Sequence, residues 1–258
     1  TAQKGEKMHT KEQLKQDLYN LGIRPGDTVL MHSSFKSLGG IDGGAEAFFE
    51  AFLELLGKDG TLVLPTLSYS YVTAENPVFD RRETKSCVGY LSEYFRTSVP
   101  GVIRSMHATH SCAAFGRLAE EMTRDHELDD TPVGPNSPFT KLPKVGGKIL
   151  MLGCNFGSNT SMHGVEEKSC PFYLFSDDNK LTYTLRDGDR TVNVFSKRHN
   201  FVVDGVHVQQ RYARVLPLLS GDELSLGKVL DADCALMDAA AVWRVGHEKL
   251  LENPEYFI

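Results

Sequence analysis

The hydrophobic pattern of the first quarter of the chain is typical of a strand, a helix and a second strand. Residues 28–31 form a short apolar run, and residues 45–56 carry apolar side chains at the spacing of one helical face. A second apolar run covers residues 61–64 and ends at Pro65. Two strands joined by a helix pair in parallel with a right-handed crossover, so residues 28–64 predict a βαβ unit.

Further elements follow from capping residues and apolar runs. Thr10 and Gln13 form a capping box before a short amphipathic helix that Gly22 ends, and Asp42 and Asp238 are expected to cap two more helices. The pattern also predicts helices over 88–96 and 117–126 and strands over 112–115 and 148–152.

The last third of the chain has a different pattern. Residues 181–185 and 191–195 flank Asp187-Gly188 and predict a hairpin, and 201–203 with 206–208 indicate more β structure. We therefore expect a mixed, largely parallel central sheet flanked by helices, with a smaller antiparallel β and helical C-terminal portion. The chain is interpreted as one α/β domain, 1–258, in which 8–170 carries the chemical motifs and 171–258 completes the acceptor site.

Composition narrows the class of protein. Lys plus Arg number 28 against 34 Asp plus Glu, a net charge of −6, which argues against non-specific nucleic-acid binding. The chain has no apolar run of transmembrane length and no signal-peptide pattern, so we expect no membrane partner and a cytoplasmic location. Its five cysteines are scattered and contain no C-x-x-C pair, which indicates reduced thiols rather than disulfides or a structural zinc site.

A candidate catalytic pair follows the apolar run at 148–152. Asn159, Thr160 and Ser161 are N-cap residue types, so a helix is expected to begin there with His163 in its first turn. Glu166 then lies on the same face, where its carboxylate reaches the imidazole, fixes its tautomer and stabilises its protonated form. The pattern is that of a general base with its partner, although His and Glu at this spacing also form purely structural pairs.

A candidate anion site follows the first strand. Residues 32–40 are rich in hydroxyls and glycine and precede a helix N-terminus, where backbone N–H groups favour phosphate. The loop matches neither the P-loop nor the G-x-G-x-x-G pattern, which disfavours ATP and NAD. An ordinary glycine-rich turn is the alternative.

The histidine-rich loop at 104–111 raises a metal site as another alternative. His107 and His110 have no nearby acidic ligand, so zinc would have to be held by distant segments, for example with His163. Cys112 begins an apolar run and is interpreted as a packing residue. No G-x-S-x-G elbow supports a serine hydrolase.

Several stretches together resemble one family, the aminoglycoside 3-N-acetyltransferases of the antibiotic-resistance type. Five ordered matches between residues 28 and 167 carry the resemblance. They are His32-Ser33-Ser34-x-x-Ser37-Leu38-Gly39 with Gly43-Gly44, Gly60-Thr61-Leu62-Val63-Leu64-Pro65-Thr66, Arg104-Ser105-x-His107-x-x-Ser111-x-Ala113-Ala114-x-Gly116, Ser137-Pro138-Phe139-x-Lys141-Leu142, and Gly147-Lys148-Ile149-Leu150 through Thr160-Ser161-x-His163-x-x-Glu166.

The resemblance implies an acetyl-CoA-dependent N-acyltransferase with its own α/β fold and no metal. The family's catalytic His and Glu fall on His163 and Glu166. Transfer is expected to be direct, with His163 taking a proton from the amine as it attacks the thioester. The coenzyme A contacts fall on the first loop and on the loop near residue 107, at His32, Ser33, Ser34, Phe35, Lys36, Ser37, Ser105, His107 and Ser111.

The acceptor is an amine, and the resemblance favours the 3-amino group of a 2-deoxystreptamine aminoglycoside. Family members typically carry an acidic segment after the hairpin, whereas this chain has Lys197-Arg198-His199, and basic side chains disfavour a polycation. Negative charge from Asp177, Asp178 or Asp204 is the alternative. Three alternatives stay open. The acceptor is a different amine, the protein is a metal-dependent hydrolase that uses His107, His110 and His163, or it binds coenzyme A or a nucleotide without turnover. A homodimer is expected from base rates alone.

Overall fold

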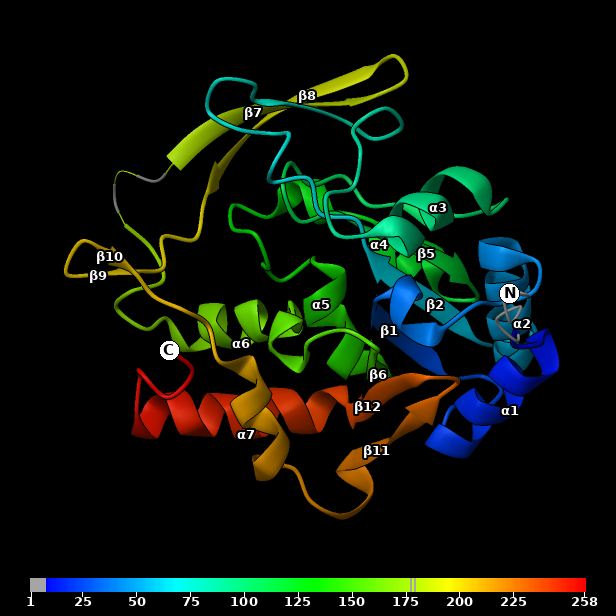
Figure 1. Ribbon diagram of the computed structural model, residues 1–258. Helices are drawn as coiled ribbons and strands as arrows, with labels where there is room; N and C mark the ends of the chain where they lie inside the picture. The colour runs from blue at the N-terminus through cyan, green and yellow to red at the C-terminus, as the bar shows by residue number, and fades with distance from the viewer. Residues whose placement is uncertain (1–7, 177, 179) are drawn as a thin grey trace, which may run out of the picture.

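The structure, a computed structural model, describes residues 8–176, 178 and 180–258 (Figure 1). Within these residues seven strands form a central sheet in the order β11-β12-β6-β1-β2-β5-β4. Their bounds are Thr28–Ser33 for β1, Thr61–Pro65 for β2, Ile103–Arg104 for β4, Cys112–Gly116 for β5, Lys148–Leu152 for β6, Leu224–Val229 for β11 and Ala232–Asp238 for β12.

The mixed α/β class predicted from the sequence is confirmed, and so is the parallel pairing of β1 with β2. The sheet is parallel only at its centre, because β6 and β2 flank β1 in parallel while β5 and β12 pair antiparallel on either side. The expectation of a largely parallel sheet overstated this share. The C-terminal third is also less separate than expected, since β11 and β12 form a hairpin that extends the central sheet beside β6.

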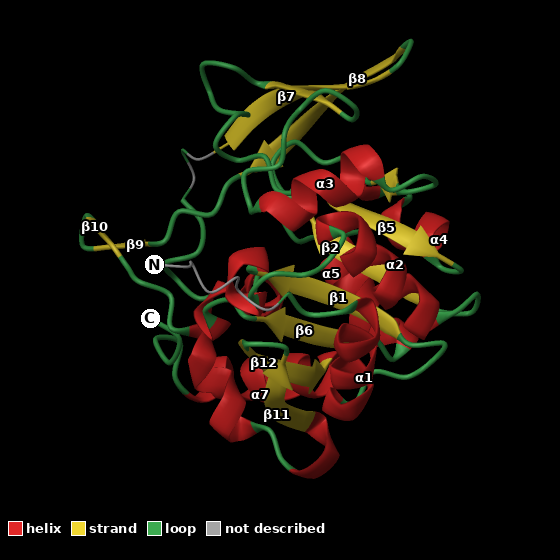
Figure 2. Cartoon of the chain, turned by 45° about the vertical axis from the view of Figure 1, so that its right-hand side comes forward, coloured by secondary structure: helices red, strands yellow, loops and turns green. Residues whose placement is uncertain are grey.

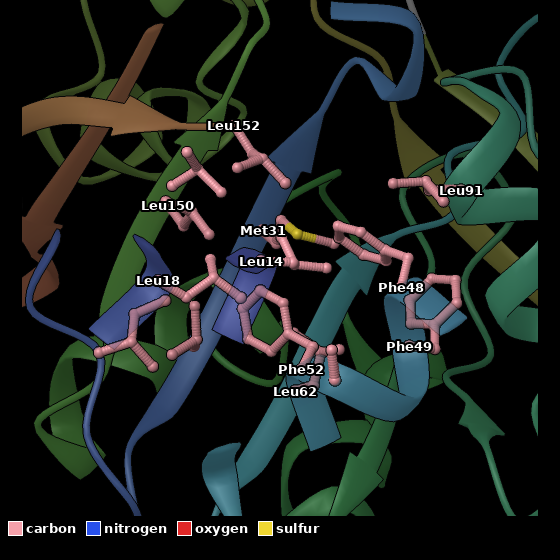
Figure 3. Packing of buried hydrophobic residues seen from close by; sticks show 14 of the residues in the cluster. Leu14, Leu18, Met31, Phe48, Phe49, Phe52, Leu62, Leu91, Leu150 and Leu152 are labelled. Atoms are coloured by element: carbon pink, nitrogen blue, oxygen red, sulfur yellow. The ribbon is translucent and has the colours of Figure 1, made fainter. Parts of the chain in front are cut away.

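Helices cover both faces of the sheet (Figure 2). Successive strand residues point to opposite faces, so Val29 and Met31 pack into one apolar cluster and Leu30 into another. The first cluster is filled by α1, Lys11–Leu21, α2, Gly44–Leu56, and α3, Tyr90–Ser98 (Figure 3). The second is filled by α4, Ala119–Thr123, α5, Pro138–Lys141, α6, Ser161–Ser169, and α7, Ala239–Glu252.

Of the helix caps predicted at Thr10, Asp42 and Asp238, two are confirmed, and α6 begins after Thr160 as predicted, although the Thr160 side chain makes no cap hydrogen bond. Thr10 and Gln13 form the capping box of α1, and Asp238 accepts a hydrogen bond from the backbone of Ala241 at 2.7 Å. Asp42 does not cap α2, because Gly43 takes the N-cap position with a φ of 80°. The predicted helix over 117–126 is shortened to α4, since Asp125 adopts a φ of 64° and the chain continues as a 3-10 turn.

A second, smaller sheet stands apart from the central one, at the top of Figure 1. It contains β3, Val78–Asp80, and the predicted hairpin, which runs from β7, Lys180–Asp187, to β8, Arg190–Lys197. The further β structure is a short hairpin of β9, Val202–Val203, and β10, Val206–His207. Six 3-10 turns complete the described elements: Phe35–Leu38, His126–Leu128, Leu142–Val145, Phe156–Ser158, Tyr212–Leu218 and Gly221–Glu223.

A membrane-spanning helix is absent from the part of the chain that the structure describes.

The connections after β1 and β6 create a crevice at one edge of the sheet. The two strands are parallel neighbours, with Ser33 opposite Leu152 at their carboxyl ends. The chain after β1 leads to α2 on one face, while the chain after β6 leads to α6 on the other. Such a reversal opens the sheet edge to ligands. The close approach of the loops requires Gly153, whose φ is 65° and where a Cβ atom would lie 2.8 Å from the Cβ atoms of Ser37 and Ala232.

Candidate active site

A cavity of about 710 Å³ lies at this edge of the sheet. Its wall is assembled from the end of β1, the loop after β2, the histidine-rich loop, the start of α6 and the segment after β8. His32, His110, His163 and His199 all line it, as does Tyr212. The cavity therefore gathers titratable side chains from segments that are far apart in the sequence.

His163 lies in the first turn of α6, and its side chain is 18% exposed. Its Nδ1 atom lies 2.9 Å from the phenol oxygen of Tyr212 and 3.4 Å from Oε2 of Glu166. The same phenol donates to Oε2 of Glu166 at 2.6 Å. The tyrosine thus stands between the imidazole and the carboxylate and makes the shorter contact with each.

These contacts assign the tautomer of His163. The carboxylate of Glu166 can only accept, so the Tyr212 hydroxyl proton points toward it and the phenol oxygen is left to accept a hydrogen bond. Nδ1 of His163 therefore carries a proton, and Nε2 carries the lone pair. A neutral imidazole held in this tautomer can accept a proton at Nε2.

Glu166 is completely buried, and phenols hold both of its carboxylate oxygens. Tyr173 donates to Oε1 at 2.9 Å, opposite Tyr212 on Oε2. Burial, reinforced by the negative charge of Glu166, raises the pKa of both tyrosines above the usual value. Both phenols consequently stay protonated and serve as donors at neutral pH.

Two more histidines face His163 across the cavity. The ring of His199 lies 4.9 Å from that of His163 between centroids, and the ring of His110 lies 6.0 Å away. Nε2 of His199 bonds to Oε1 of Glu167 at 2.7 Å. Burial, followed by the nearby imidazoles, lowers the pKa of His110 and His199 well below the usual value, and burial raises the pKa of Glu167 to about 7. Both imidazoles are accordingly neutral near pH 7.

Two polar atoms of the cavity wall have no hydrogen-bond partner among the described residues. They are Nε2 of His32 and Nδ2 of Asn159, and both side chains are more than 90% buried. Burial, and secondarily the charge of His163, lowers the pKa of His32 to about 3. An unsatisfied buried polar group costs free energy, so these two atoms have unused hydrogen-bonding capacity in residues that line the cavity.

The loop after β1 places the residues assigned to coenzyme A at one side of the cavity. Ser33 lines the cavity, Ser37 donates to the hydroxyl oxygen of Ser34 at 2.8 Å, and Lys36 is exposed. Phe35 packs edge-on against Phe48 of α2. A 3-10 turn over Phe35–Leu38 follows the strand, so this loop does not run directly into the N-terminus of α2 as the sequence pattern indicated.

Three further residues assigned to coenzyme A lie behind the cavity wall. Ser105 and Ser111 are fully buried. The hydroxyl of Ser105 bonds to Nδ1 of His126, and the hydroxyl of Ser111 donates to the backbone oxygen of Thr66. His107 accepts from the backbone N–H groups of Thr109 and His110 and bonds to the backbone oxygen of Thr131. The structure thus shows these three side chains holding the loop that carries His110, and none of them lines the cavity.

A sequence model described as Aminoglycoside 3-N-acetyltransferase matches residues 30–251. The chain belongs to this family. The match begins in β1 and ends in α7, so it includes every segment of the cavity wall.

Curated members of the family are similar over different shares of the chain. Aminoglycoside N(3)-acetyltransferase VII of Streptomyces paromomycinus is 34% identical over 174 residues, which cover 61% of this chain and 60% of that protein. Aminoglycoside N(3)-acetyltransferase IX of Micromonospora chalcea is 29% identical over 260 residues, 91% of this chain and 90% of that one. The match to the Streptomyces paromomycinus protein therefore spans 60% of the length of that protein.

Solved structures of family members share the fold. Aminoglycoside acetyltransferase AAC(3)-IVa, as a histidine-to-alanine variant in complex with a gentamicin, superimposes with a TM-score of 0.81 at 26% identity, covering 99% of this chain and 93% of that one. The binary complex of AAC-IIIb with CoASH gives a TM-score of 0.79 at 25% identity, covering 95% and 97%.

The residues that sequence reasoning missed come from the C-terminal third of this family member. Tyr173 and Tyr212 stand in stretches without periodicity, and nothing in their spacing links them to Glu166. The sequence pattern places His199 only in a basic segment. Asp178 and Asp204 do not line the cavity, and Asp177 lies outside the described residues.

Proposed function

We propose that this protein is an acetyl-CoA-dependent N-acetyltransferase that acts by direct transfer, with His163 as the general base. The observation that carries the proposal is the contact of Tyr212 with both His163 and Glu166 at the cavity wall. This contact orients Nε2 of the imidazole as a proton acceptor, and membership of the aminoglycoside 3-N-acetyltransferase family supplies the reaction class.

The chemistry required of His163 is the movement of one proton. An alkylamine with a pKa of about 10 is mostly protonated at neutral pH, so its ammonium form first loses a proton to bulk water before the nitrogen becomes nucleophilic. As the free amine nitrogen attacks the thioester carbonyl carbon, Nε2 of His163 takes the N–H proton that this nitrogen must lose to become an amide. Collapse of the tetrahedral intermediate breaks the carbon–sulfur bond, and the imidazolium returns the proton to the leaving thiolate. Tyr212 and Glu166 stabilise that imidazolium.

Asn159 is the proposed donor to the oxyanion. Its Nδ2 atom lacks a partner among the described residues, and the residue lines the same cavity as His163. Its Oδ1 accepts from the backbone N–H of Ser161, which fixes the orientation of the amide. A preoriented donor of this kind stabilises the charge that develops on the thioester oxygen.

The loop after β1 is the proposed site of coenzyme A. His32 and Ser33 line the cavity. The loop continues through Ser34, Phe35, Lys36 and Ser37, and the exposed ammonium group of Lys36 suits a phosphate. The complex of AAC-IIIb with CoASH supports a coenzyme A site in this fold. Because Ser105, His107 and Ser111 are committed to bonds within the protein, their proposed role is to position the cavity wall.

The proposed acceptor is an amine, with the 3-amino group of a 2-deoxystreptamine aminoglycoside as the first candidate. The names of the relatives and the gentamicin complex of AAC(3)-IVa support this class. The described cavity wall favours a second candidate, an amine with fewer positive charges, because it includes Arg198 and no Asp or Glu. Unlike charges attract and like charges repel, so a polycation gains little from such a wall.

The test is release of free thiol from acetyl-CoA with a panel of aminoglycosides and of monoamines, with mass spectrometry of the products. An aminoglycoside that gains a single acetyl group supports the first candidate. Turnover confined to monoamines supports the second. Hydrolysis of acetyl-CoA at one rate with and without every amine would contradict an N-acetyltransferase.

A metal-dependent hydrolase using His107, His110 and His163 receives no support from the geometry. Nδ1 of His107 accepts from the backbone N–H groups of Thr109 and His110, and Nε2 bonds to the backbone oxygen of Thr131, so both ring nitrogens of His107 are engaged within the protein.

A further inference from the structure

Three histidines from separate segments of the described chain converge at the cavity. His110 comes from the loop before β5, His163 from α6 and His199 from the segment after β8. One ring nitrogen from each lies within 4.8 Å of one from each of the others. All three residues line the cavity.

Each imidazole also bonds to a protein group through one ring nitrogen. Nδ1 of His110 bonds to the hydroxyl of Thr109 at 2.8 Å. Nδ1 of His163 bonds to Tyr212 at 2.9 Å, and Nε2 of His199 bonds to Glu167 at 2.7 Å. Metal-binding histidines characteristically bond to a carboxylate or another polar group through the nitrogen opposite the metal, which fixes the ring and raises its basicity.

We propose that His110, His163 and His199 bind one divalent transition-metal ion, of which zinc is the best match. Three imidazoles suit zinc, nickel or copper. Magnesium and calcium prefer carboxylate oxygens, and no Asp or Glu stands among the described residues of the wall. Zinc–nitrogen bonds of about 2.0–2.1 Å require the rings to move closer by roughly an ångström. A fourth position then faces the cavity.

Bound zinc inhibits acetyl transfer. The lone pair on Nε2 of His163 that would accept the proton of the amine is used for the metal instead, and the ion occupies the space between the histidines. The inhibition rests on the proposed function of His163, whereas binding of the metal does not. The site is thus a point at which free zinc regulates the enzyme rather than a cofactor site.

The binding test is calorimetric titration of the chelator-treated full chain with zinc chloride, supported by the visible absorption of bound cobalt. We expect one ion per chain and a tetrahedral cobalt spectrum. His199→Gln and His110→Asn should each weaken binding about 10-fold or more. His247→Gln is the matched control because His247 bonds to Ser169 on the helical side of α6, outside the cavity, and it should bind zinc as the original chain does.

Circular dichroism identifies which of the two variants is folded, and either folded variant suffices. Absence of saturable binding, or undiminished binding by a folded His199→Gln or His110→Asn, would overturn the site.

The inhibition test compares thiol release with zinc and with excess chelator. We expect zinc to inhibit the original chain and to inhibit the folded variants less. One-to-one binding with unchanged turnover would overturn the inhibition alone, and one-to-one binding without any transferase activity would instead reject the proposed function.

Discussion

Tyr212 bonds to Nδ1 of His163 at 2.9 Å from a position 49 residues later in the chain. The orientation of the proposed base therefore depends on how the C-terminal third packs against α6, and not on α6 alone. The spacing of His163 and Glu166 on one helix places them 3.4 Å apart, which is longer than the two contacts that Tyr212 makes. The phenol converts a loose pair into an ordered one.

Tyr212→Phe tests this arrangement. The variant keeps the ring but removes the donor to Glu166 and the acceptor for His163, so the imidazole loses its fixed tautomer. We expect kcat to fall about 10- to 100-fold with coenzyme A affinity changed by less than about two-fold. Tyr173→Phe is the matched control, since it removes a phenol from Glu166 without touching His163, and its effect on kcat should be smaller. Equal losses in the two variants would mean that both phenols only support Glu166.

Glu166→Gln removes the negative charge beneath the imidazole. The amide still fills the buried site, but it stabilises an imidazolium less than a carboxylate does. We expect kcat to fall by about 10- to 1,000-fold, less than for loss of His163 itself. Steady-state kinetics as a function of pH provides the measurement. A variant with the rate and the pH profile of the original enzyme would show that Glu166 is structural.

The helical part of the site could be predicted from the sequence because it is local. Apolar runs and capping residues placed β6 before α6, and helical spacing put Glu166 on the face of His163. The position of the crevice followed from parallel strands whose carboxyl ends meet.

The rest of the site is made by long-range contacts that no local pattern encodes. Tyr212 and His199 reach the cavity because the segment from β7 to β10 leads the chain out over the sheet edge and back, while Tyr173 reaches Glu166 from the segment after α6. The strands β11 and β12 were missed because Gly227 and the charged residues of their solvent-facing side weaken the apolar alternation. The loop after β1 was expected to run directly into a helix, whereas a 3-10 turn separates it from α2.

Gly164→Ala tests the packing of α6 on α7. A Cβ atom at this position would lie 2.5 Å from two ring carbons of Trp243 and 2.8 Å from a methyl of Val133. Alanine favours a helix over glycine by about 1 kcal/mol, but the overpacking costs about 1–3 kcal/mol and should win. We expect a lower free energy of unfolding in urea and a lower kcat, because the backbone of His163 moves with its neighbour.

Gly164→Ala with Trp243→Leu is the companion variant. The smaller side chain removes the clash, so we expect the double variant to be more stable than the sum of the two single changes. Strict additivity would show that Trp243 is not what limits the space at residue 164.

Stability should fall in acid partly because of His32. Its pKa is lowered to about 3 in the folded chain, while the unfolded value is 6.5. Below pH 6.5 the unfolded chain takes up a proton that the folded chain refuses, so the free energy of unfolding decreases as pH falls and the loss grows until about pH 3. At pH 5 this group contributes about 2 kcal/mol of destabilisation.

Urea unfolding at pH 7 and pH 5 of the original chain and of His32→Gln measures that contribution. Carboxylates titrate alike in both proteins, so the difference between the two pH dependences isolates His32. The variant should lose less stability between pH 7 and pH 5. Equal losses in the free energy of unfolding of the two proteins would mean that His32 takes up a proton as readily in the folded chain as in the unfolded chain.

The most direct measurement is the turnover of acetyl-CoA with a productive amine by His163→Ala, paired with calorimetric binding of coenzyme A. The account predicts that kcat falls by about 10²- to 10⁴-fold while coenzyme A affinity changes by less than about two-fold, because the base is lost and the coenzyme loop is untouched. His247→Ala should match the original enzyme in both readouts, since His247 lies outside the cavity. A His163→Ala enzyme with normal kcat would contradict the assignment of the base.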